Sequence, residues 1–261
     1  MPETFTLHTT RYAPRERHAP HWHGELQLSL LLGGSLTEFA GGQQETATTL
    51  SVAVKDAGVV HGDEFGPAGA LIARLDLPAG SLANLLDDPR RGSSWRWHHD
   101  PAVAGPFLRL VARGDHGTFT LDDPDIVDLL AGLSTRPLAG SGAPPRWLDQ
   151  LRRRLEAEWE PGLSVATVAS WARVHPVYLA RCFRRFYGQG VAEHLRWLRL
   201  RHATTDLFAA RNDVAAVAHE AGFADEAHFS RTFRAWTSLA PSRFRKHLGR
   251  LPMSPSPAPR G

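Results

Sequence analysis

The chain has 261 residues, of which 42% are hydrophobic and 22% are charged, a balance typical of a globular protein with one large domain or two ordinary ones. It has no run of 18 apolar residues, and its N-terminus has no apolar core, so we expect neither a membrane span nor a secretory signal. A single cysteine excludes an intramolecular disulfide and favours the reducing cytoplasm.

The net charge of +3 is unevenly distributed along the chain. Residues 1–145 hold 11 Lys and Arg against 17 Asp and Glu, a charge of −6, whereas residues 146–261 hold 19 against 10, a charge of +9. An acidic half followed by a basic half indicates two domains with different partners, and the basic half favours a polyanion such as nucleic acid. Arginines on solvated helix faces would give the same charge, so charge alone does not decide the partner.

The first part of the chain predicts a β-rich domain. Residues 5–80 alternate apolar runs, such as ELQLSLLL and ALIARLDL, with glycines that we expect to form turns, including Gly33 and Gly34. Regular short strands with glycine turns are typical of a sandwich or a small barrel. Helices are expected at 101–113 and 123–133, the second with Asp122 or Asp123 as N-cap and Pro124 in its first position.

The helix at 123–133 carries an apolar stripe on which we expect two copies of the chain to meet. This stripe consists of Ile126, Leu129, Leu130 and Leu133. A stretch rich in Pro, Gly and Ser follows at 134–147, and strand signals stop there. We therefore expect a domain at 1–135, a linker at 136–146, a helical domain at 147–250 and a disordered tail at 251–261.

The helical half contains a weak internal repeat. Small and apolar residues recur at an offset of 49: Val165, Val168, Ala169, Ala172 and Val174 as Val214, Val217, Ala218, Ala221 and Phe223. Three more recur at an offset of 50: Leu179, Arg181 and Phe183 as Phe229, Arg231 and Phe233. Each copy has the parts of a helix-turn-helix, with Gly222 at one corner and Asp225 placed to cap the following helix. Residues 191–210 between the copies are long enough for a helix of ~5 turns.

The second helix of each copy predicts a surface for DNA. The N-terminal part of such a helix meets base edges in the major groove. The candidate positions are Val177, Ala180, Arg181 and Arg184 in the first copy and Glu226, Ala227, Ser230 and Arg231 in the second. The arginines could contact guanine through two donors, or could instead contact phosphate or form an ion pair. Phe183, Phe233 and Phe244 are expected in the core.

Residues 148–247 resemble the DNA-binding domain of the AraC family. The stretches FSRTF, from Phe229 to Phe233, and PSRFR, from Pro241 to Arg245, match the family pattern position by position. The match departs at Arg173, where Gly is usual, and at His175, where Ser is the usual N-cap. The resemblance implies two helix-turn-helices, held by a long linker helix, that enter successive major grooves.

The stretch HWHGELQLSLLLGG resembles the first motif of the cupin fold. His21 and His23 match its two histidines, Gln27 stands where Glu is usual, and Gly34 ends it. The second motif is matched only by Asp56, Gly58 and His61. Three imidazoles and a carboxamide can bind zinc, nickel or iron. The same residues could instead hold a small molecule by hydrogen bonds, or simply fill the barrel.

The two resemblances together predict an α+β multidomain protein. We expect an N-terminal cupin-like β-barrel with flanking helices and a C-terminal all-α domain with two helix-turn-helix motifs. AraC family members commonly join such domains, so we expect a cytoplasmic transcriptional regulator that answers to a small molecule or a metal. The alternatives are a metal-dependent cupin enzyme and a constitutive regulator whose barrel only dimerises it. No nucleophile and base pair stands out, so an enzyme is disfavoured. Expected partners are double-stranded DNA, an effector, a second copy and RNA polymerase, with no membrane.

Overall fold

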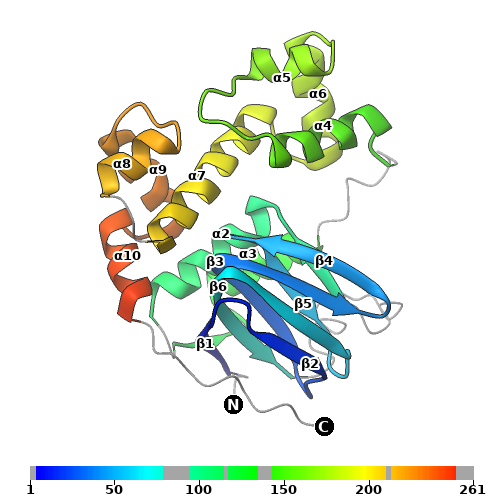
Figure 1. Ribbon diagram of the computed structural model, residues 1–261, viewed down its shortest axis with the longest axis vertical. Coiled ribbons are helices and arrows are strands. Elements are labelled where there is room, and N and C mark those ends of the chain that lie inside the picture. Colours follow the sequence, from blue (N-terminus) through cyan, green and yellow to red (C-terminus); the bar gives the residue numbers. More distant parts are fainter. Residues whose placement is uncertain (1–3, 79–94, 115–116, 135–142, 210–212, 251–261) are drawn as a thin grey trace. The chain divides into compact units, whose positions relative to one another are not determined.

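The computed structural model describes residues 4–78, 95–114, 117–134, 143–209 and 213–250 (Figure 1). Its first part is an antiparallel sheet. The strands are β1 Thr4–Tyr12, β2 Arg17–His21, β3 Leu26–Ala40, β4 Gln43–Thr48, β5 Val52–Lys55, β6 His61–Leu77, β7 Trp95–His98 and β8 Thr118–Thr120. The strand order is β7-β5-β3-β6-β1-β8, while β2 pairs with β6 and β4 pairs with β3. An N-terminal β-rich domain is therefore established.

The two longest strands, β3 and β6, differ from the short strands predicted from the sequence. Gly33 and Gly34 do not form a turn, because β3 continues through them with register shifts on both sides. Gly34 has φ +85°, and a Cβ there would lie 2.0 Å from the carbonyl oxygen of Gly69, so the site requires glycine. The glycines thus form β-bulges that bend two paired strands.

Closure of this sheet into a barrel stays a prediction. Among the described strands the pairing path ends at β7 and β8, and no pair joins them. On the edge of β6 away from β3, the partner strand changes along the length of β6: residues 61–64 pair with β2, and residues 70–76 pair with β1. This change gives the domain two differently partnered ends, and the histidine-bearing part of β6 lies at the β2 end.

Helices α2 Pro101–Ala112 and α3 Pro124–Ser134 confirm the two helices expected in this half, and they pack on each other. Asp123 caps α3 by accepting the Asp125 N–H at 3.0 Å. The predicted dimer contact on α3 is wrong. Its apolar stripe of Ile126, Leu129, Leu130 and Leu133 is buried within the chain, at most 8% exposed. The stripe faces the chain's own core because burying it there removes the same apolar area from water.

The second part of the chain is helical, as the pattern after residue 147 predicts. Its helices are α4 Arg146–Ala157, α5 Val165–Trp171, α6 Pro176–Tyr187, α7 Val191–Ala209, α8 Val214–Glu220, α9 Glu226–Thr237 and α10 Pro241–Arg250. The helix α7 matches the long linker helix expected at 191–210. Phe183, Phe233 and Phe244 are at most 1% exposed, which confirms their place in the core. None of the described helices is long and apolar enough to cross a bilayer.

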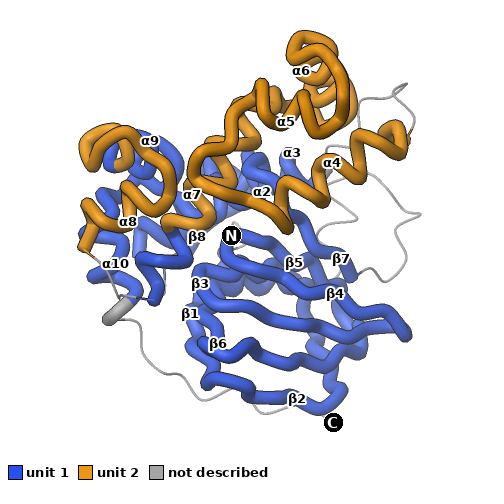
Figure 2. Tube along the Cα trace, turned by 45° about the horizontal axis from the view of Figure 1, so that its top comes forward, with its two compact units in different colours: residues 1–134, 204–211, 230–261 blue, residues 135–203, 212–229 orange. Residues whose placement is uncertain are grey.

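The chain forms two compact units whose limits differ from the predicted domain boundaries (Figure 2). The first comprises residues 1–134, 204–211 and 230–261, and the second comprises 135–203 and 212–229. Within the first unit, Thr205 Oγ1 donates to Thr49 Oγ1 at 2.9 Å, and the Arg11 guanidinium donates to the Leu248 carbonyl at 3.0 Å. The final residues of α7 and the helix α10 therefore contact the sheet, so α7 and α9 each contribute to both units.

Candidate functional site

The first helix-turn-helix consists of α5 and α6. Ser164 caps α5 by accepting the Thr167 N–H at 3.1 Å. After the helix, Arg173 adopts the left-handed conformation with φ +54°, and the Val174 N–H returns to the Ala169 carbonyl at 3.1 Å. His175 then caps α6 with its ring, whose Nδ1 accepts the Val177 N–H at 3.2 Å. The two departures from the AraC pattern therefore keep the ordinary turn: Arg173 takes the left-handed position, and His175 caps the next helix.

The second helix-turn-helix, α8 and α9, repeats this turn 49 residues later. Asp213 caps α8, and Gly222 takes the left-handed conformation with φ +75°. The Phe223 N–H returns to the Ala218 carbonyl at 2.9 Å, the counterpart of the bond in the first copy. Asp225 caps α9 by accepting the His228 N–H at 2.6 Å, as predicted. The repeat in the sequence is therefore a repeat in backbone geometry.

The candidate DNA-contacting residues lie on the outward faces of α6 and α9. Leu179 and Phe183 face the core from α6, and Phe229 and Phe233 do so from α9. The remaining positions leave side chains in solvent: Val177, Arg181 and Arg184 on α6 and Glu226, Ala227 and Arg231 on α9 are exposed, while Ala180 and Ser230 are half-buried. Their exposure permits contact with DNA, and the contact itself stays a prediction.

The second candidate site is a cavity in the sheet domain that brings the predicted histidines together. His21 on β2 is paired in register with His61 on β6, and His23 follows two residues after His21. The ring centroids are 4.4 Å apart for His21 and His61, 5.0 Å for His21 and His23, and 5.3 Å for His23 and His61. One ligand atom from each ring lies within 4.8 Å of the other two. Gln27 on β3 is buried and lines the same cavity.

Two of these histidines are held with one ring nitrogen toward the cavity. Nδ1 of His21 donates to the Ala19 carbonyl at 2.9 Å, and Nδ1 of His61 donates to the Val59 carbonyl at 3.1 Å. Since Nδ1 carries the proton, Nε2 is the acceptor in each ring. A backbone carbonyl on the remote nitrogen is also how metal-ligating histidines are commonly oriented.

Burial keeps the imidazoles of His23 and His61 neutral. It lowers the pKa of His23 to about 3, with a further contribution from the positive charge of Lys55. Burial and Lys55 likewise lower the pKa of His61. Neutral rings retain the lone pair that a metal ion or a hydrogen-bond donor requires. These shifts favour a site that is ready to bind at neutral pH.

Sequence reasoning missed a buried ion pair beside His61. The Lys55 ammonium on β5 donates to Glu38 Oε1 on β3 at 2.7 Å and to His61 Nε2 at 3.1 Å. The Glu38 carboxylate also accepts the indole N–H groups of Trp97, at 2.9 Å, and Trp95. Burial lowers the pKa of Lys55, but Glu38 and Asp63 more than offset this, so the net pKa is raised and the ammonium stays charged. Trp97 on β7 therefore lines the cavity and links it to Glu38.

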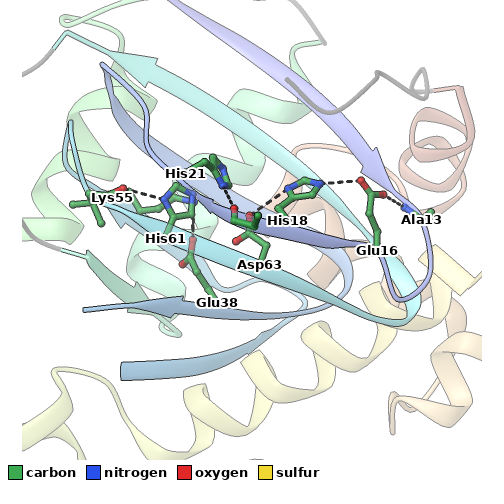
Figure 3. Close-up of polar contacts among 10 residues, drawn as sticks. Ala13, Glu16, His18, His21, Glu38, Lys55, His61 and Asp63 are labelled. Atoms are coloured by element: carbon green, nitrogen blue, oxygen red, sulfur yellow. Dashed lines mark hydrogen bonds and ion pairs between the residues drawn. The ribbon is translucent and has the colours of Figure 1, made fainter. Parts of the chain in front are cut away.

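Sequence reasoning also missed Asp63 and His18. They face each other across β6 and β2, with His18 Nδ1 3.5 Å from Asp63 Oδ2, and His18 Nε2 lies 2.9 Å from Glu16 Oε1 (Figure 3). The bond to Asp63 outweighs burial and raises the pKa of His18. Burial raises the pKa of Asp63, but the hydrogen bond with His18 and the positive charge of Lys55 lower it by more. The net pKa is therefore below its ordinary value, and Asp63 is ionised. The spacing of Asp63 from His61 was a signal, since alternate residues of a strand share a face.

The cavity is small. It offers about 40 Å³ for the centres of water-sized molecules, where one water needs roughly 10–15 Å³. That space holds a hydrated ion or a small polar molecule, and a larger metabolite would require the walls to move. Three imidazoles beside a carboxylate offer nitrogen and oxygen ligands of the kind that zinc, nickel and iron take, so the residues are compatible with a divalent metal.

Comparison with known proteins finds a helix-turn-helix domain family over residues 168–247. The chain is 33% identical to the HTH-type transcriptional regulator GlxA of Rhizobium meliloti over 183 residues, 69% of this chain and 49% of that protein. It is 32% identical over 125 residues to a putative AraC-like transcription regulator of Streptomyces antibioticus, 48% of this chain and 38% of that protein. The chain thus spans about half or less of the length of these relatives.

Among solved structures, a transcriptional regulator from Chromobacterium violaceum with an AraC-type DNA-binding domain is 24% identical to this chain. The match covers 40% of this chain and 93% of that one, with a TM-score of 0.37.

Proposed function

Because the chain belongs to the AraC family of helix-turn-helix transcriptional regulators, we propose that it binds specific DNA sequences and that a ligand in the histidine cavity sets its response. The family is one of regulators rather than of enzymes. The observation that carries the DNA-binding part is the repeated turn, in which Arg173 and Gly222 take the same left-handed conformation 49 residues apart.

The basic charge of residues 146–261 supports DNA as the partner. Arg181 on α6 and Arg231 on α9 are exposed, and each lies two residues before a buried phenylalanine that fixes the helix in the core. A guanidinium presents two donors that match O6 and N7 of guanine. We infer that Arg181 and Arg231 read bases and that Arg184 contacts the backbone phosphates.

The histidine cavity supports the sensing part of the proposal. His21, His23, His61 and Gln27 line a polar space in a domain separate in sequence from the helix-turn-helices. In the proposal a metal ion or a small polar molecule binds there and changes the activity of the DNA-binding helices. A second copy of the chain and RNA polymerase are further proposed partners. No surface is assigned to the second copy, since the stripe on α3 is buried.

The test uses the full chain and a library of DNA fragments that includes the region upstream of its own gene. Binding is measured by fluorescence anisotropy over a salt series, with and without divalent metals and candidate metabolites. Affinity for a preferred fragment should fall steeply with salt, since several phosphate contacts release counterions. Absence of sequence preference at low salt would refute the DNA-binding part. Preference that no ligand alters, and that survives substitution of His21, His23 and His61 by Ala, would identify a constitutive regulator.

A further inference from the structure

Asp63 is a buried carboxylate in the cavity wall with one unpaired oxygen. Its side chain is 8% exposed, and its Oδ1 has no hydrogen-bond partner among the residues that the structure describes. The other oxygen, Oδ2, lies 3.5 Å from His18 Nδ1. Leaving a buried, ionised oxygen without a donor costs free energy, so this group indicates a ligand that donates hydrogen bonds.

Two of the cations that line the cavity already have anionic partners. The Lys55 ammonium donates to Glu38 Oε1 at 2.7 Å. The Arg74 guanidinium donates to Asp76 Oδ2 at 3.1 Å. Each pair is neutral as a whole, so neither cation leaves a net positive charge to balance Asp63.

A third cation, His18, is shared between two carboxylates (Figure 3). Its Nε2 lies 2.9 Å from Glu16 Oε1, and its Nδ1 lies 3.5 Å from Asp63 Oδ2. The hydrogen bond with Asp63 outweighs burial and raises the pKa of His18, which favours the protonated ring. One imidazolium against two carboxylates leaves one negative charge at this end of the cavity. A ligand with a single positive charge would balance it, whereas a divalent ion would leave an excess.

His21 is a second hydrogen-bond acceptor beside Asp63. Its Nδ1 donates to the Ala19 carbonyl at 2.9 Å, which leaves Nε2 as the acceptor. A ring nitrogen of His21 and a carboxylate oxygen of Asp63 lie within 4.8 Å of each other. Two acceptors of one tetrahedral ammonium, each ~2.9 Å from its nitrogen, lie about 4.7 Å apart. An ammonium nitrogen can therefore bridge the two groups without any movement of the strands.

The cavity also has the size and the walls for a small cation. It offers about 40 Å³ for the centres of water-sized groups, which is room for roughly three of them at 10–15 Å³ each. The rings of Tyr12 and Phe65 stack with centroids 4.1 Å apart, and both line the cavity together with Trp97. Aromatic rings attract a cation through their quadrupole. A primary ammonium with a short carbon chain fits this space.

We propose that this cavity binds the ammonium group of a small primary amine, with Asp63 as its counter-ion and His21 as a second acceptor. The inference rests on the proposed sensing function and gives its ligand a chemical class. An imidazole nitrogen favours an N–H donor over an alkali ion of the same charge, because hard cations take oxygen ligands. A neutral alcohol donates one hydrogen bond and leaves the charge of Asp63 unbalanced.

The experiment titrates the full chain, freed of metal by a chelator, at constant ionic strength, and calorimetry measures the affinity. Methylammonium and ammonium carry N–H donors, K⁺ has the same charge and no donor, and methanol has a donor and no charge. Methylammonium should bind more tightly than ammonium, because its methyl group buries apolar area. K⁺ and methanol should not bind. Comparison of the first two probes separates an organic amine from the inorganic ion.

Three variants test the residues in the same titration. Asp63→Asn removes the charge and should weaken methylammonium binding by about tenfold or more. His18→Gln removes the imidazolium that competes for Asp63 and should tighten binding. Glu64→Gln should bind as the wild type does, and it is the matched control because Glu64 neighbours Asp63 on β6 and pairs with Arg17. Thermal unfolding reports whether each variant is folded.

Four outcomes would overturn the proposal: no binding of methylammonium by the wild type, equal binding of K⁺, tighter binding of ammonium than of methylammonium, or unchanged affinity in Asp63→Asn. A loss in His18→Gln as large as that in Asp63→Asn would also overturn it, since Asp63 would then be structural. DNA binding is measured separately. A chain that prefers a DNA sequence but binds no methylammonium would overturn this inference alone, and the reverse result would overturn only the DNA-binding part of the proposed function.

Discussion

The two turns of the helix-turn-helices adopt one conformation with two different residues. Gly222 and Arg173 both have positive φ, +75° and +54°, and the next N–H returns to the same point of the preceding helix. Glycine takes this conformation at no steric cost, whereas a residue with a side chain pays roughly 1–2 kcal/mol. The second copy is therefore built without strain and the first copy with it. A turn of this kind can therefore tolerate an unfavourable residue where its surroundings leave room for the side chain.

The two turns also differ in the space that their surroundings leave for a side chain. A Cβ at Gly222 would lie 2.5 Å from the carbonyl oxygen of Pro161, a contact with backbone that cannot yield cheaply. Arg173 carries its side chain in solvent. The second turn is thus constrained by both conformation and space, and the first by conformation alone.

Substitution of the constrained glycine should have the largest effect. Gly222→Ala combines positive φ with the clash at Pro161, so we expect the free energy of unfolding to fall by roughly 3 kcal/mol or more. Chemical denaturation of the full chain measures this. Gly188→Ala, at a positive-φ helix end with open space around it, is the control and should cost only about 1 kcal/mol. Equal losses in the two variants would show that crowding at Pro161 does not matter.

The two copies should also differ measurably in DNA recognition. Arg231→Ala is expected to weaken specific binding by ~1–3 kcal/mol and to relax one base position. Arg181→Ala should do the same at a different position. Arg153→Ala is the control, because Arg153 is exposed on α4, outside both recognition helices. Selection from a random DNA pool gives the readout. Unchanged base preference in both recognition variants would reassign these arginines to phosphate.

Relief of the strained turn should stabilise the chain slightly. Arg173→Gly removes the left-handed side chain, and we expect the free energy of unfolding to rise by about 1 kcal/mol or less, since glycine also gains entropy in the unfolded state. DNA affinity should stay within twofold if Arg173 has no contact with DNA, and a larger fall would assign it one. A loss of stability would mean that the Arg173 side chain has a stabilising contact.

Mild acid should weaken the first copy by the smallest amount. Burial lowers the pKa of His194, beside Phe183, to about 3. The unfolded chain protonates this ring below pH 6.5 while the folded chain does not, so stability falls as pH drops through 6.5. Between pH 7 and pH 6 this amounts to about 0.7 kcal/mol. Denaturation at several pH values, in the wild type and in His194→Leu, should show a shallower slope in the variant. Equal slopes would remove His194 from the account.

Sequence alone predicted what short-range rules determine. The cap at Asp225, the core phenylalanines of α6 and α9 and the long α7 all follow from spacings within a few helical turns. The meeting of His21, His23 and His61 followed from a resemblance whose motif already contains the long-range pairing. The DNA contacts and the identity of the ligand stay predictions, since the structure holds neither partner.

The rest depends on which strands pair and in which register. Asp63 faces His18 and Glu38 because β6 lies between β2 and β3, in a register that no local pattern states. The same holds for Lys55, whose ammonium reaches His61 only after β5 has joined β3. Gly33 and Gly34 were predicted to form a turn because glycine is the preferred residue both in turns and in the β-bulges of a long strand. The apolar stripe of α3 was predicted to be a dimer interface because the spacing of apolar residues shows that one helix face is buried, but not which part of the protein covers it.

The hydrogen bonds of Glu38 couple the cavity to two fluorescent side chains. Two indoles from β7 donate to one carboxylate, and the same carboxylate holds the ammonium that occupies His61. An ion that takes His61 from Lys55 must shift that ammonium toward Glu38 and so change the electric field at both rings. The emission of Trp95 and Trp97 would then respond to occupancy of the cavity, with no dye attached and no DNA present. The chain thus contains its own optical reporter of the event that we propose controls it.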